Sequence, residues 1–162
     1  HPQYRVATLM RVGALYLKQG RCEASIGAYE EALVIAEVIG DHRQVVSVLI
    51  GMAQNRRLVG DAEAAAIAAH RALSVGQDLG SKPVIAAALL EFARAQRDIG
   101  EANAAARAVG LARLLGDEAM QVEADALSAA LPSVQMDHAS EQQVEDAVIE
   151  LINQREFGEL TL

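Results

Sequence analysis

The sequence has no tryptophan, one cysteine and three prolines, and aromatic residues make up only 3% of its 162 residues. The single cysteine, Cys22, excludes an internal disulfide and a cluster of thiolate metal ligands. No apolar run approaches the ~20 residues that a membrane-spanning helix needs, and no secretory signal peptide is visible. We therefore expect a cytoplasmic protein that has no membrane partner.

The sequence also lacks the alternation of apolar and polar residues that is typical of half-buried strands. Alanine, the strongest helix former, is abundant, and apolar residues make up 52% of the chain. In residues 44–59 the apolar residues recur at steps of three and four, which is the spacing of one helix face. Composition and spacing together predict an all-α fold.

Glycine recurs every twenty residues, at Gly20, Gly40, Gly60, Gly80 and Gly100. A helix of about 17 residues fits each interval, and glycine is favoured just past a helix end because it adopts the left-handed conformation without a Cβ clash. Asp41, Asp61 and Ser81 follow three of these glycines and can cap the next helix, since their side chains accept from its free N–H groups. Glu101 is a poorer cap. The pattern predicts antiparallel helices joined by short turns.

Residues that are forty positions apart match more closely than residues twenty apart. The matching sets are Leu9, Leu49 and Leu89; Gly13, Ala53 and Ala93; Ser25, Ala65 and Ala105; and Ala32, Ala72 and Ala112. The repeating unit is therefore a pair of helices. One such pair cannot bury its apolar face alone, so we expect the units to stack and share a continuous core.

Residues 3–130 resemble the tetratricopeptide repeat superfamily. In the first unit the residues that carry the resemblance are Leu9, Val12, Gly13, Tyr16, Gly20, Ser25, Tyr29 and Ala32. The forty-residue spacing and the Gly-Asp junctions are similar to those of the helical arms of bacterial signalling ATPases and of MalT-type transcription regulators, and to the scaffold repeats of cell-polarity adaptors. Departures from the family pattern are Arg56 and Gln96 at the Tyr16 position and the absence of a proline that closes each unit.

The resemblance implies a right-handed α-solenoid of about 3.5 helical hairpins. Its repeats would occupy residues 1–131, with units near 2–40, 42–80 and 82–116 and a half unit at 117–131. In such a stack the first helix of each unit lines a concave groove, and the second helices form the convex back.

The segment after the repeats has a different pattern. Residues 132–139 are predicted to form a loop, and Ser140 with Gln143 has the spacing of a capping box. The helix that follows has an apolar stripe of Val144, Ala147, Val148, Leu151 and Ile152. We expect residues 140–162 to form a capping helix and tail at the open end of the stack. Docking of this acidic and apolar segment in its own groove, or in that of another copy, is the alternative.

The sequence shows no motif for catalysis or for a cofactor. It contains no phosphate loop, no G-x-G-x-x-G and no G-x-S-x-G. His42, His70 and His138 are far apart and have no second ligand at helical spacing. We expect neither an enzyme nor a metal or cofactor site.

The predicted first helices, at residues 2–19, 42–59 and 82–99, hold most of the basic residues of a chain whose net charge is −8. These are Arg5, Arg11, Lys18, Arg43, Arg56, Arg57, Lys82, Arg94 and Arg97, and only Glu91 and Asp98 oppose them in the same helices. If the first helices line a groove, as the resemblance implies, that groove is basic.

We therefore predict a partner-binding groove with an apolar floor and basic walls. Its residues are Met10, Arg11, Lys18, Ile50, Gln54, Arg57, Leu90, Arg94 and Arg97. Arginine binds carboxylates through its planar fork, so the expected partner is an acidic protein or peptide segment with apolar anchors. The family's clamp for chaperone tails is not matched, because Met10 and Ala14 stand where it has lysine and asparagine.

The function predicted from the sequence is a non-enzymatic interaction module, the sensor or scaffold region of a larger bacterial regulatory protein in signalling or transcription regulation. Self-association through the exposed faces of the end repeats is the alternative. Contact with nucleic acid is less favoured, because the net charge is negative and few aromatic rings are present to stack on bases.

Overall fold

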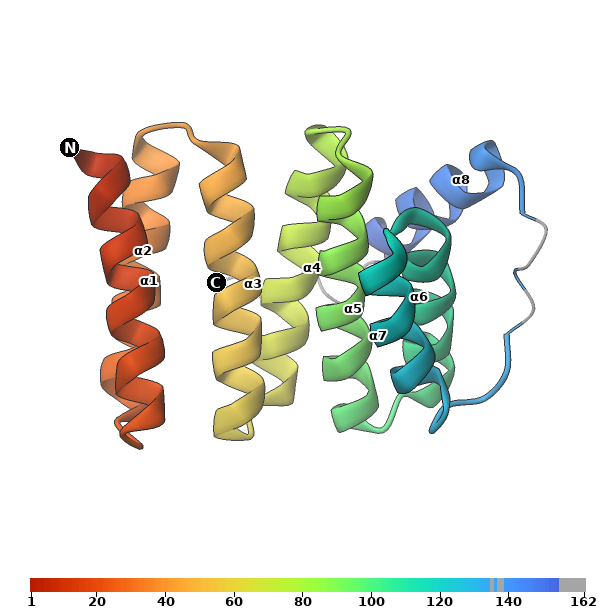
Figure 1. The fold of residues 1–162 in the computed structure, drawn as a ribbon, viewed down its shortest axis with the longest axis horizontal. Coiled ribbons are helices and arrows are strands. Elements are labelled where there is room, and N and C mark those ends of the chain that lie inside the picture. Colours follow the sequence, from red (N-terminus) through yellow and green to blue (C-terminus); the bar gives the residue numbers. More distant parts are fainter. Residues whose placement is uncertain (135, 137–138, 155–162) are drawn as a thin grey trace.

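The structure is a computed structural model, and it describes residues 1–134, 136 and 139–154. Within these residues the chain forms eight α-helices and no strand, as the sequence predicted (Figure 1). The helices are α1 (Pro2–Lys18), α2 (Cys22–Val38), α3 (His42–Val59), α4 (Ala62–Asp78), α5 (Lys82–Ile99), α6 (Ala102–Leu115), α7 (Glu118–Ser128) and α8 (Glu141–Ile152).

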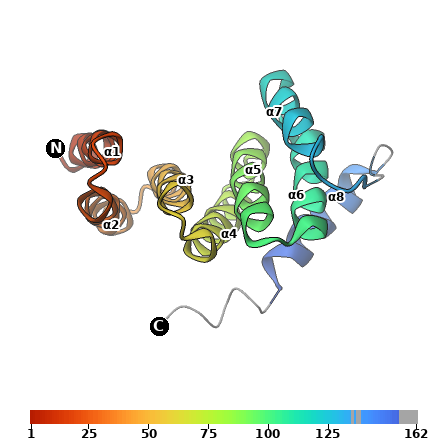
Figure 2. The same cartoon turned by 90° about the horizontal axis from the view of Figure 1, so that it is seen from below.

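The helices pack as consecutive hairpins, α1 with α2, α3 with α4 and α5 with α6. Figure 2 shows α1, α3, α5 and α7 in one row and α2, α4 and α6 in a second row. The first row is curved, with α1 and α7 at its two ends, so the first helices lie on the inner side of the curve. The stacked hairpins that the forty-residue period predicts are confirmed. We call the inner surface of α1, α3 and α5 the first-helix face.

The glycines at twenty-residue spacing end the helices in the way the sequence predicted. All five have a positive φ, from 62° at Gly80 to 103° at Gly100, and no other described residue has one. At Gly60 the backbone N–H donates to the Arg57 carbonyl at 3.0 Å and closes the last turn of α3. A side chain at such a position would be strained, which explains the choice of glycine.

Side-chain caps start several of the helices. Asp41 accepts from the Gln44 N–H at 3.1 Å and Asp61 accepts from the Ala64 N–H at 3.1 Å, and Ser140 forms a capping box with Gln143. The predicted cap at Ser81 is wrong, since its side chain makes no capping bond. Pro83 lacks an N–H group, but the caps at Asp41 and Asp61 bond the third N–H of their helices, which Val84 also has, so the proline does not explain the difference.

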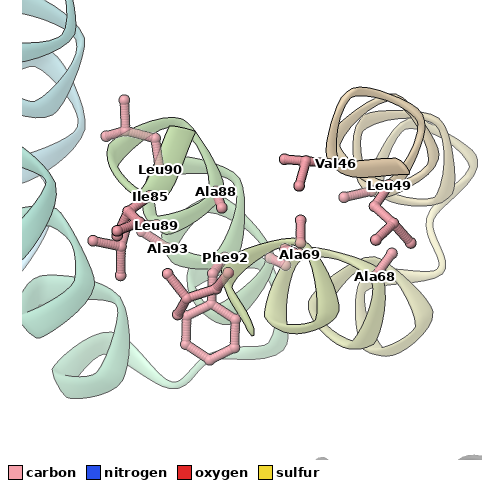
Figure 3. Packing of buried hydrophobic residues seen from close by; sticks show 14 of the residues in the cluster. Val46, Leu49, Ala68, Ala69, Ile85, Ala88, Leu89, Leu90, Phe92 and Ala93 are labelled. Carbon is pink, nitrogen blue, oxygen red and sulfur yellow. The ribbon is translucent and has the colours of Figure 1, made fainter. Parts of the chain in front are cut away.

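Small residues lie where the helices cross most closely. The sets predicted for these crossings are buried: Gly13, Ala53 and Ala93; Ser25, Ala65 and Ala105; and Ala32, Ala72 and Ala112. Figure 3 shows Val46 and Leu49 of α3 pointing toward Ala69 and Ala68 of α4. Within this hairpin the larger apolar side chains of α3 thus pack on alanines of α4, and these alanines let the two helix backbones approach.

Tyr29 of α2 packs between α1 and α3, where each helix has a glycine. A Cβ atom at Gly13 would lie 2.8 Å from the ring Cε2, and one at Gly51 would lie 2.5 Å from Cε1. Burial raises the pKa of the Tyr29 phenol, so the ring stays neutral. One unit later the Tyr29 position is Ala69 and the Gly51 position is Glu91. At the junction of units one and two, the second helix supplies the large side chain. At the junction of units two and three, the first helix of unit three supplies it.

A buried polar contact also joins the first two units. The Asn55 amide Nδ2 donates to the Ser25 hydroxyl, and this hydroxyl donates to the Gly13 carbonyl at 2.6 Å. Both side chains are at most 1% exposed. The forty-residue equivalents of Asn55 are Leu15 and Ala95, so the contact occurs only between units one and two.

The third unit is shorter than the first two, as its predicted bounds of 82–116 imply. Helix α6 has 14 residues, whereas α2 and α4 have 17 each. Helix α7 then continues the row of first helices and buries Ala124 and Leu127. The described residues of the predicted loop at 132–139 contain no regular secondary structure.

Helix α8 lies elsewhere than the sequence predicted. We expected it to cap the open end of the stack, but it packs along α4 and α6 on the side of the second helices. Its Val144, Val148 and Leu151 are buried there. Helix α8 ends at Ile152, and residues 155–162, the last part of the predicted helix and tail at 140–162, lie outside the described residues.

Ion pairs also join α8 to the repeats. Lys82 pairs with Glu141 at the start of the helix, and Arg107 Nη2 lies 3.6 Å from Glu150 Oε2 near its end. The hydrogen bond and the charge of Lys82 lower the pKa of Glu141. His70 Nε2 of α4 also lies 3.2 Å from the Leu151 carbonyl oxygen. The acidic helix α8 is thus paired with basic residues of α5 and α6, which the sequence did not predict as its partners.

Candidate partner-binding face

The residues predicted to line the groove come from three helices of the first row. They are Met10, Arg11 and Lys18 of α1, Ile50, Gln54 and Arg57 of α3, and Leu90, Arg94 and Arg97 of α5. Arg11, Lys18, Gln54 and Arg97 are exposed, and Met10, Ile50, Arg57 and Arg94 are half-buried. Leu90 differs, because it is only 2% exposed and belongs to the core. The apolar floor is therefore open on α1 and α3 but not on α5.

A polar network crosses this face from α3 to α7. Glu91 is almost completely buried; its Oε1 accepts from Gln54 Nε2 at 3.2 Å and pairs with Arg94. Arg94 Nη2 also donates to Glu123 of α7 at 2.9 Å. Burial lowers the pKa of the Arg94 guanidinium, but the hydrogen bonds and charges of Glu123 and Glu91 together raise it above its ordinary value. Arg94 is thus a structural cation that joins α5 to α7, and Glu91 extends the network to α3.

Asp98 holds the other two arginines of the predicted site. Arg57 Nη1 lies 3.5 Å from Asp98 Oδ2, and Arg97 Nη2 lies 3.0 Å from Asp98 Oδ1. Glu91 and Asp98, the only acids in the first helices of the three units, therefore contact Arg57, Arg94 and Arg97. The pairs at Asp98 are partly exposed, and an exposed pair contributes only ~0–1 kcal/mol. A carboxylate from a partner can compete with Asp98 for both arginines.

Three other cations on the first helices are unpaired. Arg11 and Lys18 of α1 and Arg43 of α3 are exposed, and they form no ion pair with any other residue that the structure describes. Arg43 lies seven residues before Ile50, so the two side chains lie on the same side of α3. Arg43 is not among the residues predicted for the site, although this seven-residue spacing could have identified it. The free positive charge of the face lies on α1 and at the start of α3.

The described part of the chain contains no site for a metal. No group of three or more His, Cys, Asp and Glu side chains in residues 1–134, 136 and 139–154 could hold an ion. His42 is exposed and His70 contacts α8, whereas His138 lies outside the described residues. None of the helices in the described residues has the length and apolar character needed to cross a membrane.

One cleft lies where α8 crosses the repeats. It is lined by Gln77, Gly80, Lys82, Ile85, Leu115, Glu141, Glu145 and Val148. The ion pair between Lys82 and Glu141 stands in its lining, and no nucleophile with an adjacent base lies among these residues. The cleft therefore contains no catalytic arrangement.

Comparison with known proteins identifies the class of the repeats. Residues 4–78 match the family described as Tetratricopeptide repeat, and these residues span α1 to α4. The searches of curated proteins and of solved structures gave no match. The first two hairpins are thus tetratricopeptide repeats, which in general are protein-interaction modules, and no enzyme family is among the matches. The third hairpin, α5 with α6, continues their forty-residue period and their packing.

Proposed function

We propose that the protein binds an acidic protein or peptide segment with apolar anchors along the first-helix face. The observation that carries this proposal is the presence of unpaired cations, Arg11, Lys18 and Arg43, beside the half-buried Met10 and Ile50 on one face of a tetratricopeptide repeat stack. Cations beside open apolar positions favour a segment that combines carboxylates with leucine-like or phenylalanine-like side chains.

The cations of the face differ in what binding would cost. Lys18 and Arg43 can contact a partner without losing an ion pair. Arg57 and Arg97 would exchange Asp98 for a partner carboxylate, which is nearly neutral in free energy at an exposed site. Arg94 would have to leave the nearly buried Glu91, and an uncompensated buried carboxylate is strongly unfavourable. We therefore assign first contact to α1 and α3 and a structural role to Arg94.

The test uses an array of synthetic peptides that combine Glu or Asp with Leu or Phe, together with matched peptides in which the acids are Gln or Asn. We expect the acidic peptides to bind and their neutral counterparts to bind at least ~10-fold more weakly, which is about 1.4 kcal/mol. Lys18→Glu with Arg43→Glu should weaken binding by a similar factor, because the new carboxylates would face those of the peptide. The fold should be unaffected, because neither residue has an ion pair to lose. Arg21→Glu with Arg71→Glu makes the same charge change outside the face and should have less than a twofold effect.

Equal binding by the Lys18 and Arg43 double variant and the parent, with unchanged circular dichroism, would show that the face is not the binding site. The acidic second-helix side would then be tested with basic peptides. A single-stranded oligonucleotide serves as a further probe, and we expect it not to bind, because the net charge is −8.

We further propose that the module is the sensor or scaffold region of a larger bacterial regulator in signalling or transcription. This part of the proposal is supported by the resemblance of its forty-residue spacing and Gly-Asp junctions to those of regulator arms. A coding region that joins the repeats to a nucleotide-binding or DNA-binding domain would support it, and one that joins them to an unrelated enzyme would contradict it.

A further inference from the structure

Helix α8 lies outside the repeats, and a small contact holds it in place. Figure 2 shows it beyond both rows of helices, and it packs on α4 and α6. It buries three side chains, Val144, Val148 and Leu151, whereas α6 buries six. A helix of 12 residues is marginal by itself in water, so α8 depends on this contact. We call the surface that α8 covers, on α4, α6 and the start of α5, the α8 site.

The fit of α8 to this site is incomplete beside its first two turns. A cleft of about 130 Å³ lies there between the helix and the repeats, well above the ~10–15 Å³ that one water molecule needs. Glu145 lines this cleft, is exposed, and forms no ion pair with any residue that the structure describes. The repeats line the same cleft with Ile85 and Leu115. A leucine or methionine in place of Glu145 would add apolar contact with these two side chains.

Basic side chains stand at both ends of the α8 site. Lys82 pairs with Glu141 in the first turn of α8, and Arg107 pairs with Glu150 in its last turn. These four side chains are between 43% and 76% exposed, so the pairs contribute little to stability, but they do select the charge of the helix that binds. The site therefore favours a helix with a carboxylate in its first turn and another in its last turn.

We propose that the α8 site binds an amphipathic helix of a partner protein, and that α8 covers the site until this helix displaces it. The partner helix repeats the apolar stripe of α8, carries a carboxylate in its first and last turns, and has leucine or methionine where α8 has Glu145. Because α8 is joined to the repeats, it competes at a high effective concentration, and the added contact at the cleft offsets this advantage. The α8 site lies on the side of the second helices, so the inference does not rest on the proposed function of the first-helix face.

A fluorescently labelled peptide of residues 139–154 serves as the probe, and fluorescence anisotropy measures its binding to the full chain. Val148→Asp in the chain places a carboxylate in the apolar contact and should release the chain's own α8. We expect this variant to bind the peptide at least ~10-fold more tightly than the parent does, because α8 no longer competes. Ile149→Asp is the matched control, since Ile149 of α8 is 40% exposed, and this variant should bind the peptide as the parent does.

The cleft is tested with altered peptides. A peptide with Glu145→Leu should bind ~10-fold more tightly than the unchanged peptide, because the leucine adds apolar contact at the cleft. A peptide with Asp146→Leu makes the same chemical change at an exposed position that does not line the cleft, and it should show no such gain. Added to the parent chain, the Glu145→Leu peptide should also speed hydrogen exchange in α8, because it displaces this helix. That measurement does not depend on the folding of any variant.

Charge reversal locates the binding site. Arg107→Glu, introduced into the Val148→Asp chain, should weaken peptide binding at least ~10-fold, and a peptide with Glu150→Arg should restore it. Lys18→Glu with Arg43→Glu alters the first-helix face and should leave binding of this peptide unchanged, which separates the two sites. Circular dichroism checks that each variant keeps its repeats helical.

Three results would overturn the proposal. Equal binding of the peptide by the parent and by the Val148→Asp chain would show that α8 does not cover the site. Equal affinity of the Glu145→Leu and Asp146→Leu peptides would show that the cleft does not select the helix. A parent dimer in light scattering that Val148→Asp dissociates would show that the occupant is α8 of a second copy and not a helix of a partner protein.

Discussion

Tyr29 occupies space that Gly13 and Gly51 leave open on the two neighbouring helices. The ring is 8% exposed and is enclosed from both sides, so it cannot move far to accommodate a larger residue. At this crossing the packing depends on the absence of a methyl group at each of the two glycines. Glycine in a helix is otherwise unfavourable by about 0.5–1 kcal/mol relative to alanine. The two glycines therefore reflect steric need and not helix preference.

Gly51→Ala tests this interpretation at the scale of one residue. We expect it to lower the free energy of unfolding by about 1–2 kcal/mol, because the cost of overpacking against Tyr29 exceeds the gain in helix propensity. Gly27→Ala is the matched control, since Gly27 lies within α2 and a Cβ there would meet nothing within 4 Å. It should raise stability by about 0.5–1 kcal/mol. Urea denaturation measures both, and stabilisation by both substitutions would refute the steric account.

The small residues of the crossings were predictable because they recur at forty-residue spacing. The contacts of individual polar side chains were not. Asn55 reaches Ser25 across two helices, and the repeat comparison gave no sign of it because Leu15 and Ala95 stand at the equivalent positions. The ion-pair partners of Arg57 and Arg94 were unpredictable for a similar reason. A long side chain can reach any acid within several ångströms, and the sequence does not say which helix supplies that acid.

At the scale of whole helices, the N-termini differ in whether a side chain caps them. Glu101 precedes α6 with φ −84° and ψ 67°, and Asp61 precedes α4 with φ −95° and ψ 73°. The backbones are nearly the same, but the Asp61 carboxylate caps its helix and the longer Glu101 side chain makes no capping bond. One methylene group separates a capped helix start from an uncapped one.

Glu101→Asp should therefore stabilise the protein by about 0.5–1 kcal/mol, since the shorter carboxylate can accept from a free N–H group at the start of α6. The reverse change, Asp61→Glu, should destabilise it by a similar amount. Thermal and urea unfolding provide the measurement, and the helix content at low temperature should not change. No gain at Glu101 combined with a loss at Asp61 would show that the two junctions are not equivalent.

Helix existence and limits were predicted well because their causes are local. A cap and a glycine act within one turn of the residue they serve, so the sequence states both. The position of α8 had no such local cause. Its apolar stripe would fit many surfaces, and the surface that it contacts, beside which Lys82 and Arg107 pair with Glu141 and Glu150, forms only after the repeats have stacked.

At the scale of the whole molecule, burial increases from the ends of the stack toward its middle. Helix α1 has two buried residues, Val6 and Gly13, whereas α5 has ten. Helix α7 likewise buries only Ala124 and Leu127. In a stack each unit is stabilised mainly by its immediate neighbours, so the units at the ends have fewer stabilising contacts.

Hydrogen exchange measured by mass spectrometry should show this gradient in dilute protein. We expect amides in α1 and α7 to exchange at least ~10-fold faster than those in α4 and α5, because the end helices open without the rest of the stack. Equal protection of α1 and α5 in the monomer would contradict the gradient.

Charge at this scale shows what the sequence could and could not predict. The excess of basic residues on the first helices was visible, and six of the nine lie in ion pairs: Arg5, Arg56, Arg57, Lys82, Arg94 and Arg97. Most of the segregated charge therefore joins one helix to another. Only a structure separates these cations from Lys18 and Arg43, which remain available to a partner.

The contact of Tyr29 with two glycines also affects the register in which the repeats stack during folding. Units of similar shape can misassemble by slipping one whole repeat, which would bring α2 against α5 in place of α3. In that register the Tyr29 ring would meet Glu91 where it now meets Gly51, and two large side chains would compete for one space. The slipped arrangement is sterically blocked at a single contact. The difference between units thus specifies their order along the stack, which their common shape alone could not do.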